Sequence, residues 1–209
     1  METIKPVLIQ RSEEWFNQRL GKVTASRISD VIAKTKTGVS TSRYNYLIQL
    51  VTERLTGKKA DSTYMSQAIQ DGIDREEAAR TLYELKHGKV SEVGFFVHPT
   101  IEMSGASPDG ALADDNGGIE IKCLIETTHT NTLMTQSIPT KYIPQMQWQM
   151  ACANYDFVDF ISYNPNFEPK LQLFVKRLDR DNDYIAQLEL EVKQFLQEVD
   201  QQILKLKEL

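Results

Sequence analysis

The sequence predicts a single α/β (α+β) domain in which helices flank a central mixed sheet, and three observations support this class. With 209 residues and 41% hydrophobic content, the chain can bury one substantial core without a second domain. Stretches of period-two alternation are separated by stripes of helical period. The sequence contains no internal repeat or low-complexity tract. We expect one domain over residues 1–209, with a helical part over 1–88, a sheet-containing core over 89–180 and a C-terminal helix over 181–207.

The N-terminal part is expected to contain four helices, which cover residues 12–21, 24–32, 44–57 and 64–87. Ser12 is a candidate N-cap of the first helix, and glycines end the first and third helices. The polar segment 34–42 has no apolar periodicity, so we expect a mobile loop there.

Thr24 and Ser26 lie at the expected start of the second helix, where backbone N–H groups are exposed. Arg19 lies just upstream, so these three side chains form a candidate phosphate site. The two hydroxyl residues are equally explained as helix caps, and the two roles are compatible.

The fourth helix carries an acidic residue, Glu76, within a stripe of apolar residues at helical spacing. Burial of a carboxylate is costly unless it meets a cation or a metal ion. Arg80, one turn later on the same face, offers the alternative of an internal i,i+4 ion pair. The periodicity alone does not decide between a metal ligand and this pair.

The second half of the chain alternates strands and helices. The expected strands cover residues 90–98, 157–163 and 171–178. Pro144 is suited to the first turn of a helix that runs to about Asn154. Gln145 and Gln149 share one face of this helix, where a glutamine either orients a ligand or is simply solvated.

The segment 107–123 carries the densest functional signal. It contains Ser-Pro-Asp-Gly, a short apolar span, the run Asp-Asp-Asn-Gly-Gly and then Ile-Glu-Ile-Lys-Cys. Turn-forming residues between two apolar alternations predict a β-hairpin. Because side chains alternate faces along a strand, Glu120 and Lys122 point the same way, about 6.6 Å apart.

The position of the hairpin turn creates a conflict. A turn centred on residues 116–117 would pair Asp109 with about Leu124. Asp109 and Glu120 would then share a face but lie roughly 13 Å apart along the strand, too far to hold one ion. We therefore expect the hairpin to bend or bulge, at Gly110.

Two carboxylates and one ammonium near a tight turn are the groups of a hydrolytic site that uses a hard cation. Asp109 and Glu120 are oxygen ligands suited to Mg²⁺, and Lys122 is suited to orient or deprotonate a water and to offset charge on a phosphorane. Taken separately, Ser-Pro-Asp-Gly is a common β-turn and Glu-x-Lys a common solvated strand face. Their combination at short spacing favours a magnesium-dependent nuclease.

Composition excludes several other classes. The two cysteines, Cys123 and Cys152, form no CxxC pair, so we expect free, buried thiols rather than a zinc site or a disulfide framework. The sequence has neither an apolar run of about 20 residues nor a signal-peptide core, and we expect a cytosolic protein. The net charge is −5, yet residues 19–60 carry +7, which leaves −12 for the rest. A phosphate track and chance clustering on a solvated surface explain this asymmetry equally well.

Five motifs occur in order between about residues 10 and 178. They are Trp15-x-x-x-Arg19-Leu20-Gly21-x-x-Thr24-Ala25-Ser26, Glu76-x-x-Ala79-Arg80, Ser107-Pro108-Asp109-Gly110, Glu120-Ile121-Lys122-Cys123 and Tyr142-x-x-Gln145-x-Gln147. Together they resemble the phage lambda exonuclease family, also called YqaJ-type viral recombinases, of the PD-(D/E)xK nuclease superfamily. Five ordered motifs are far more specific than the Pro-Asp and Glu-x-Lys pieces alone.

The resemblance implies a restriction-endonuclease-like core and a 5′-to-3′ exonuclease that digests one strand of duplex DNA to mononucleotides and leaves a 3′ overhang. It also implies two Mg²⁺ ions, which Mn²⁺ can replace, and a ring-shaped homotrimer that works processively beside a single-strand annealing protein. Such a protein is phage- or prophage-encoded and acts on double-stranded DNA ends in the bacterial cytoplasm. The alternatives are a site-specific or structure-specific endonuclease of the same fold and a non-catalytic module that binds DNA ends.

The resemblance also implies a role for individual residues. The metal ligands are three acidic side chains and one backbone carbonyl: Asp109, Glu120, Glu76 and Ile121. Lys122 is the catalytic lysine and Gln145 the active-site glutamine. Three residues form the pocket for the 5′ phosphate: Arg19, Ser26 and Ser107. Ile69 takes the position of an apolar wedge that splits the end base pair, and Lys36 that of a basic loop residue that enters the minor groove.

Overall fold

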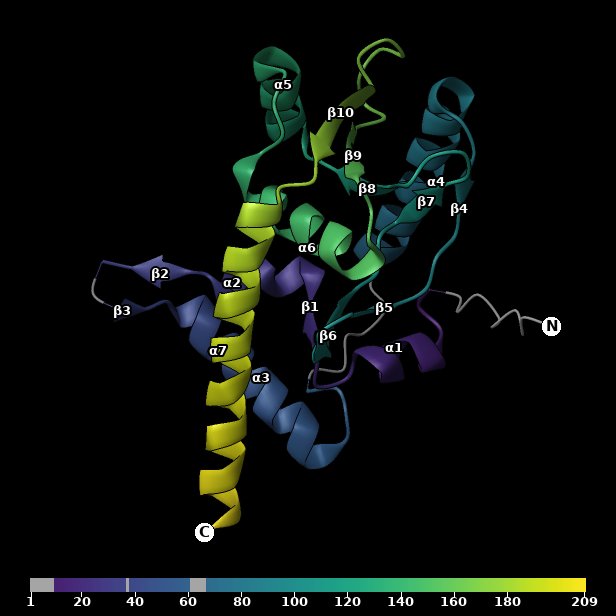
Figure 1. Cartoon of the computed structure of the whole chain (residues 1–209). Coiled ribbons are helices and arrows are strands. Elements are labelled where there is room, and N and C mark those ends of the chain that lie inside the picture. The colour runs from purple at the N-terminus through teal and green to yellow at the C-terminus, as the bar shows by residue number, and fades with distance from the viewer. Residues whose placement is uncertain (1–9, 37, 61–66) are drawn as a thin grey trace, which may run out of the picture.

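The computed structural model describes residues 10–36, 38–60 and 67–209, with the side chains of the third range described from residue 74. Both helices and strands occur along this part of the chain (Figure 1). The helices are α1 (Glu13–Arg19), η1 (Ala25–Arg27), α2 (Ile28–Val31), α3 (Thr41–Thr56), α4 (Gln67–His87), α5 (Glu126–Thr135), η2 (Thr140–Tyr142), α6 (Ile143–Ala153) and α7 (Asn182–Lys207). The strands are β1 (Val23–Thr24), β2 (Lys34–Thr35), β3 (Gly38–Val39), β4 (Val90–Ser91), β5 (Phe96–His98), β6 (Ile101–Ala106), β7 (Gly110–Leu112), β8 (Gly117–Cys123), β9 (Phe157–Tyr163) and β10 (Leu173–Asp179).

The central sheet has five strands in the order β10-β9-β8-β7-β4. Strands β8 and β9 are parallel, whereas the other neighbours are antiparallel, so the predicted mixed sheet is confirmed. Helix α4 packs on one face, where Tyr83 contributes to a core with Ile119 and Ile121. Helix α6 packs on the other face through Met146 and Met150. Since side chains alternate along β8, its isoleucines face α4 and Glu120 faces α6.

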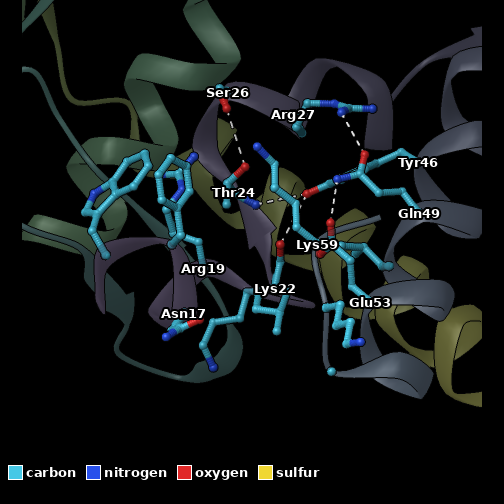
Figure 2. Close-up of a pocket in the computed structure, with 16 residues that line it drawn as sticks. Asn17, Arg19, Lys22, Thr24, Ser26, Arg27, Tyr46, Gln49, Glu53 and Lys59 are labelled. Atoms are coloured by element: carbon cyan, nitrogen blue, oxygen red, sulfur yellow. Dashed lines mark hydrogen bonds between the residues drawn. The ribbon is translucent and has the colours of Figure 1, made fainter. Parts of the chain in front are cut away.

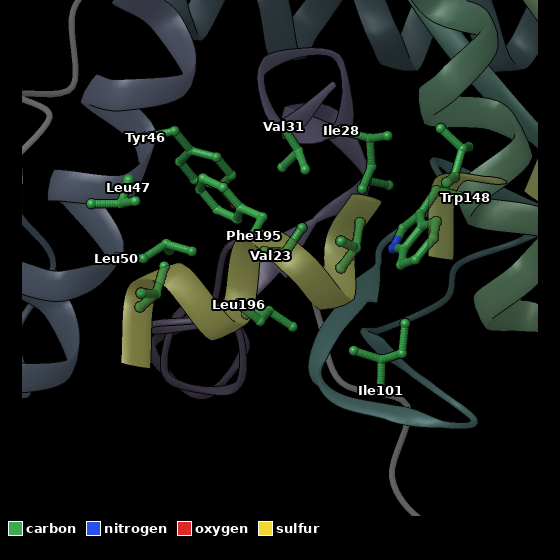
Figure 3. Close-up of a cluster of buried hydrophobic side chains, with 14 of the residues drawn as sticks. Val23, Ile28, Val31, Tyr46, Leu47, Leu50, Ile101, Trp148, Phe195 and Leu196 are labelled. Atoms are coloured by element: carbon green, nitrogen blue, oxygen red, sulfur yellow. The ribbon is translucent and has the colours of Figure 1, made fainter. Parts of the chain in front are cut away.

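A second core lies beside the central sheet, where α2, α3 and α7 surround the small β1-β6-β5 sheet (Figure 3). Its largest side chains are Tyr46, Trp148 and Phe195, each at most 1% exposed. Tyr46 and Phe195 stack with ring centroids 5.5 Å apart and so join α3 to α7. Trp148 comes from α6. This helix therefore packs both in this core and against the central sheet, and it is fixed on two sides.

Several local sequence signals for helix ends are confirmed, but the Thr24 side chain makes no capping hydrogen bond. The Ser12 hydroxyl accepts a hydrogen bond from the backbone N–H of Trp15, and Gly57 ends α3 at φ +65°. Pro144 lies in the first turn of α6. Among the described helices, none is long and apolar enough to cross a membrane.

Several elements differ from the prediction. The segment expected to be a mobile loop, 34–42, contains the β2–β3 hairpin and the start of α3. The expected strand 90–98 is two strands, because β4 pairs with β7 and β5 pairs with β6 in another sheet. Strand β6 and helix α5 were not predicted, since Ser-Gly-Ala and a threonine-rich run are poor formers of strand and helix. Both thiols are free, but Cys123 is only half-buried.

Candidate active site

The β7–β8 hairpin brings Asp109 opposite Glu120. Gly110 pairs with Ile119 and Ala111 with Gly118, so one further step in this register matches Asp109 with Glu120. Directly opposed residues have Cα atoms about 4.5–5.5 Å apart and side chains on one face. The predicted pairing with Leu124 is wrong, and the predicted bend at Gly110 is not needed.

Two glycines explain why the predicted register is wrong. Gly117 and Gly118 belong to β8 and do not adopt positive φ, so they are not turn residues. A Cβ on Gly117 would lie 2.4 Å from the ring of Phe157, and one on Gly118 would lie 2.7 Å from the ring of Tyr155. These positions lack side chains because two aromatic rings cover the strand, and the turn is therefore formed by residues 113–116.

Asp109 lies at the end of the β7–β8 ladder, where both its main chain and its carboxylate bond to β8. Its N–H still donates to the carbonyl of Ile119 at 3.1 Å, but its Oδ2 accepts from the N–H of Ile121 at 2.7 Å. Its own carbonyl accepts from Arg80 Nη2 at 2.7 Å. Burial, then Glu120, raise the pKa of Asp109 well above its ordinary value, against the opposing effect of Lys122.

Glu120 is held from three directions. Its side chain is 2% exposed. Its Oε1 accepts from Gln145 Nε2 at 2.6 Å and lies 2.5 Å from the Nζ of Lys122, and its Oε2 accepts from Gln149 Nε2 at 2.5 Å. Both carboxylate oxygens are therefore fixed, and α6 and β8 set their positions.

Lys122 lies beside Glu120, with its Nζ also 5.3 Å from the ring centre of Tyr142. Burial lowers the pKa of Lys122, but the charges of Glu120 and Asp109 outweigh burial and raise it above the ordinary value. The side chain is therefore an ammonium in this arrangement. A positive group at this position can orient a water or offset negative charge on a phosphate.

Glu76 reaches the same region from α4. Its charge is among the causes that raise the pKa of Asp109, after burial, Glu120 and the opposing Lys122. Its Oε2 lies 2.5 Å from Arg11 Nη2, and its side chain is 34% exposed. The alternative of an internal pair with Arg80 is wrong, because Arg80 instead bonds Asp109 and lies 3.8 Å from Glu92. Together with Gln10, these residues line a cavity of about 100 Å³.

The donors fit a hard divalent cation. Asp109 is half-buried and Glu120 is buried on the same face, and their repulsion is a cause of the raised pKa of Asp109, so a cation would stabilise both charges. Over residues 10–36, 38–60 and 67–209, however, no three His, Cys, Asp or Glu side chains are grouped as metal ligands. In the structure, Arg11 pairs with Glu76, and α6 holds Glu120. The carboxylates are therefore near one another but engaged by the protein's own cations and amides.

A cationic group lies next to this carboxylate site. The Arg19 guanidinium stacks 4.1 Å from the centre of the Trp15 ring, and its Nη1 donates to Ser107 Oγ at 3.0 Å. Trp15 Nε1 donates to the same oxygen at 2.9 Å. Burial lowers the pKa of Arg19 to about 10, and no carboxylate among the described residues pairs with it. Because Ser107 Oγ accepts twice, its hydroxyl proton is left to donate to a further group.

Arg19 and Ser26 line one cavity of about 470 Å³ between α1, β1, η1 and α3 (Figure 2), which we call the basic cavity. Thr24 Oγ1 lies 3.4 Å from Ser26 Oγ on its wall. The structure therefore places Arg19, Thr24 and Ser26 around one cavity. Ser107 is joined to them through its hydrogen bond with Arg19. A half-buried arginine beside hydroxyl groups forms a suitable seat for a phosphate, which we call the phosphate seat.

Comparison with known protein families shows the family of this chain. A family model, the YqaJ-like viral recombinase domain, matches residues 14–156. The chain belongs to this family. No curated protein matches the sequence.

Solved structures agree with this fold. An alkaline exonuclease (LHK-Exo) from Laribacter hongkongensis is 44% identical, with a TM-score of 0.85 over 94% of this chain and 97% of that one. LHK-Exo in complex with dAMP gives a TM-score of 0.86 at the same identity and coverage. A phage-related exonuclease from Haemophilus somnus shares the fold at 15% identity, with a TM-score of 0.68 over 88% of this chain and 96% of that one. The predicted restriction-endonuclease-like fold is thereby confirmed.

Lys36, one residue of the YqaJ-like pattern, is not joined to the site. Lys36 is exposed next to the β2–β3 hairpin, which projects away from the central sheet beside α7 (Figure 1). Lys34 in that hairpin pairs with Glu191 of α7 at 2.6 Å. The side chain of Ile69, the predicted wedge, lies outside the described residues.

Sequence reasoning missed several contacts in this site. Helical spacing placed Gln149 on the same face as Gln145, but it did not predict that Gln149 is fully buried against Glu120. Arg11 and Trp15 contact Glu76 and Ser107 across 65 and 92 residues of chain. No local pattern predicts such long-range partners.

Proposed function

We propose that this chain is a Mg²⁺-dependent 5′-to-3′ exonuclease that hydrolyses the 5′-ended strand of double-stranded DNA to mononucleotides and leaves a 3′ overhang. The observation that carries the proposal is the adjacency of two sites of opposite character. Ser107 in the phosphate seat and Asp109 in the carboxylate site are two residues apart, a span of at most about 7 Å. A strand whose 5′ phosphate contacts Ser107 thus presents its next phosphodiester near Asp109.

The carboxylate site would hold the cofactor. The donors of two Mg²⁺ ions, which Mn²⁺ can replace, are the side chains of three residues and one backbone carbonyl: Asp109, Glu120, Glu76 and Ile121. When bound, such ions lower the pKa of water and neutralise charge on the scissile phosphate. Glu76 now pairs with Arg11, and this ion pair would have to open for Glu76 to serve as a ligand.

The protein's own groups supply the remaining chemistry. The Lys122 ammonium orients the attacking water and offsets charge that builds on the phosphate. Gln145 and Gln149 fix the two oxygens of Glu120, so the carboxylate keeps its orientation through the reaction. Arg19, Ser26 and Ser107 hold the 5′ phosphate and so measure the cut at one nucleotide from the end.

The wider biological proposal rests on the family. The whole chain, 1–209, acts as one nuclease domain, assembles as a ring-shaped homotrimer around DNA and works processively beside a single-strand annealing protein in the cytoplasm of a bacterial host of the phage. Ile69 is the wedge at the end base pair and Lys36 a minor-groove contact. The support is membership of the YqaJ-like family and the 44% identity to a protein described as an alkaline exonuclease.

Digestion of a linear duplex with distinguishable 5′ and 3′ labels tests the activity. We expect rapid release of the 5′ label as mononucleotide in Mg²⁺, slow loss of the 3′ label and no release in a chelator. Closed circular duplex is the matched substrate and should remain intact. Cleavage of the circle would identify an endonuclease, and end binding without any hydrolysis would identify a non-catalytic module.

A further inference from the structure

The basic cavity is much larger than the phosphate seat at its edge. Its volume is about 470 Å³, roughly the share of fifteen water molecules in liquid. Arg19 and Ser26 occupy one side, whereas Gln49 and Glu53 of α3 line the opposite side (Figure 2). A single phosphate would leave most of this space to another part of the substrate.

Lysines line the space beyond the seat. Within the described part of the chain, Lys22 Nζ contacts the carbonyl of Glu102 at 3.3 Å and the sulfur of Met103. Neither Lys22 nor Lys58 forms an ion pair with any carboxylate that the structure describes. Glu53, the acid in the wall, is already bound by the N–H of Gly21 and by Gln49, both at 2.9 Å. The cavity therefore presents unbalanced positive charge to its contents.

An aromatic ring is exposed in the same wall. Phe16 is 43% exposed, although it is a large apolar residue. Its ring packs against that of Trp15 in a T-shaped pair with centroids 4.9 Å apart, and Lys59 Nζ lies over the Phe16 ring, 5.0 Å from its centre. Exposed aromatic rings among cations are the usual surface for single-stranded nucleic acid, because bases stack on the rings and phosphates contact the cations.

We infer that the basic cavity binds unpaired nucleotides at a 5′ overhang, with a base on Phe16 and phosphates near Lys22 and Lys58. The inference rests on the proposed function, since it extends the path of the same strand past Ser107. An overhang bound in this way places an internal phosphodiester, not the terminal phosphate, against Arg19. The 5′-phosphate preference is therefore weaker at overhanging ends than at blunt ends.

DNA binding measured in the absence of metal tests the inference separately from catalysis. Fluorescence anisotropy would compare a blunt duplex with the same duplex carrying a two-nucleotide 5′ overhang, both 5′-phosphorylated. We expect wild type to bind the overhang more tightly, and Phe16→Ala to lose about 5- to 150-fold of its affinity for the overhang, the value of one stacked base, with little change on the blunt duplex. Lys58→Ala should reduce the overhang affinity in the same direction.

Tyr44→Ala is the matched control. Tyr44 of α3 is an exposed aromatic residue like Phe16, but it lines a different groove. Equal wild-type affinity for the two duplexes, or a Phe16→Ala protein with unchanged overhang affinity, would overturn the inference. Digestion of the blunt duplex in Mg²⁺ reports on the proposed function alone, so failure of one does not imply failure of the other.

Discussion

The carboxylate site and the basic cavity differ in how their charges are balanced. At the first, Asp109 and Glu120 are crowded together, and Lys122 and two glutamines already occupy the oxygens of Glu120. At the second, Arg19 is half-buried against aromatic rings without a described carboxylate partner. One site has an excess of acid and the other an excess of base, and they meet at residues 107–109.

This difference explains how a chain of net charge −5 can act on DNA. The acidic site would repel a phosphate unless a divalent cation is present, whereas the basic cavity attracts it directly. DNA binding should therefore depend on the cavity, and hydrolysis on the carboxylates. The following variants separate the two.

The largest effect is expected at the carboxylates. Asp109→Asn and Glu120→Gln keep the shape of each side chain but remove its charge, and each should lower Mg²⁺-dependent hydrolysis by about 10³-fold or more. The measurement is single-turnover release of nucleotides from a blunt duplex. DNA-end affinity is the control and should be retained, and a variant with wild-type rates would remove its residue from the proposed mechanism.

The next largest effect separates two arginines of the basic cavity. Arg19→Ala should reduce the preference for 5′-phosphorylated over 5′-hydroxyl ends by about 10- to 100-fold, because a charged hydrogen-bond donor is lost. Arg27→Ala is the matched control, since Arg27 already pairs with Asp30. The ratio of kcat/KM on the two ends is measured, and a ratio that is unchanged in Arg19→Ala would contradict the phosphate seat.

A smaller effect separates two glutamines of α6. Gln149 donates to Glu120, whereas Gln147 donates to the carbonyl of Asp179 and accepts from the N–H of Asp181. Gln149→Met should weaken Mg²⁺ binding by about 10- to 100-fold in calorimetry. Gln147→Met should instead lower thermal stability and leave metal affinity unchanged. Similar metal affinities in both variants would make Gln149 a packing residue only.

The smallest effect is on stability and follows from pKa. Burial, and then the charge of Glu120, raise the pKa of Asp109. The contribution of this shift to folding stability is therefore full below the ordinary pKa of Asp, and it is lost as the pH rises through the raised pKa. Asp109→Asn removes this cost and should raise Tm by a few degrees at pH 8 in chelator, with the gain shrinking toward pH 4. Mg²⁺ should raise the Tm of wild type but not that of the variant. A lower Tm for Asp109→Asn at pH 8 would contradict the repulsion.

The sequence predicted those features that depend on local periodicity. Strand alternation placed Glu120 and Lys122 on one face, and the cap of α1 and the start of α6 were found at Ser12 and Pro144. Motif order identified the family that the comparisons confirm.

The remainder depends on contacts between distant segments. Turn chemistry alone placed the hairpin register incorrectly, because Gly117 and Gly118 serve the packing of Phe157 and Tyr155 rather than a turn. The partner of Glu76 is Arg11, 65 residues away, and not the local Arg80. Such pairs are set by the packing of α4 and the N-terminal segment on the sheet, which has no signature in a short window.

A linear duplex with a 5′ phosphate at one end and a 5′ hydroxyl at the other tests the central claim most directly. The two strands carry different internal labels, and the lengths of both are followed in Mg²⁺ for wild type, Arg19→Ala and Glu120→Gln. We predict that wild type shortens the phosphorylated strand first, that Arg19→Ala shortens both strands at similar slow rates, and that Glu120→Gln shortens neither. Equal shortening of both strands by wild type, at a rate that Arg19→Ala leaves unchanged, would contradict the pairing of a phosphate seat with a carboxylate site.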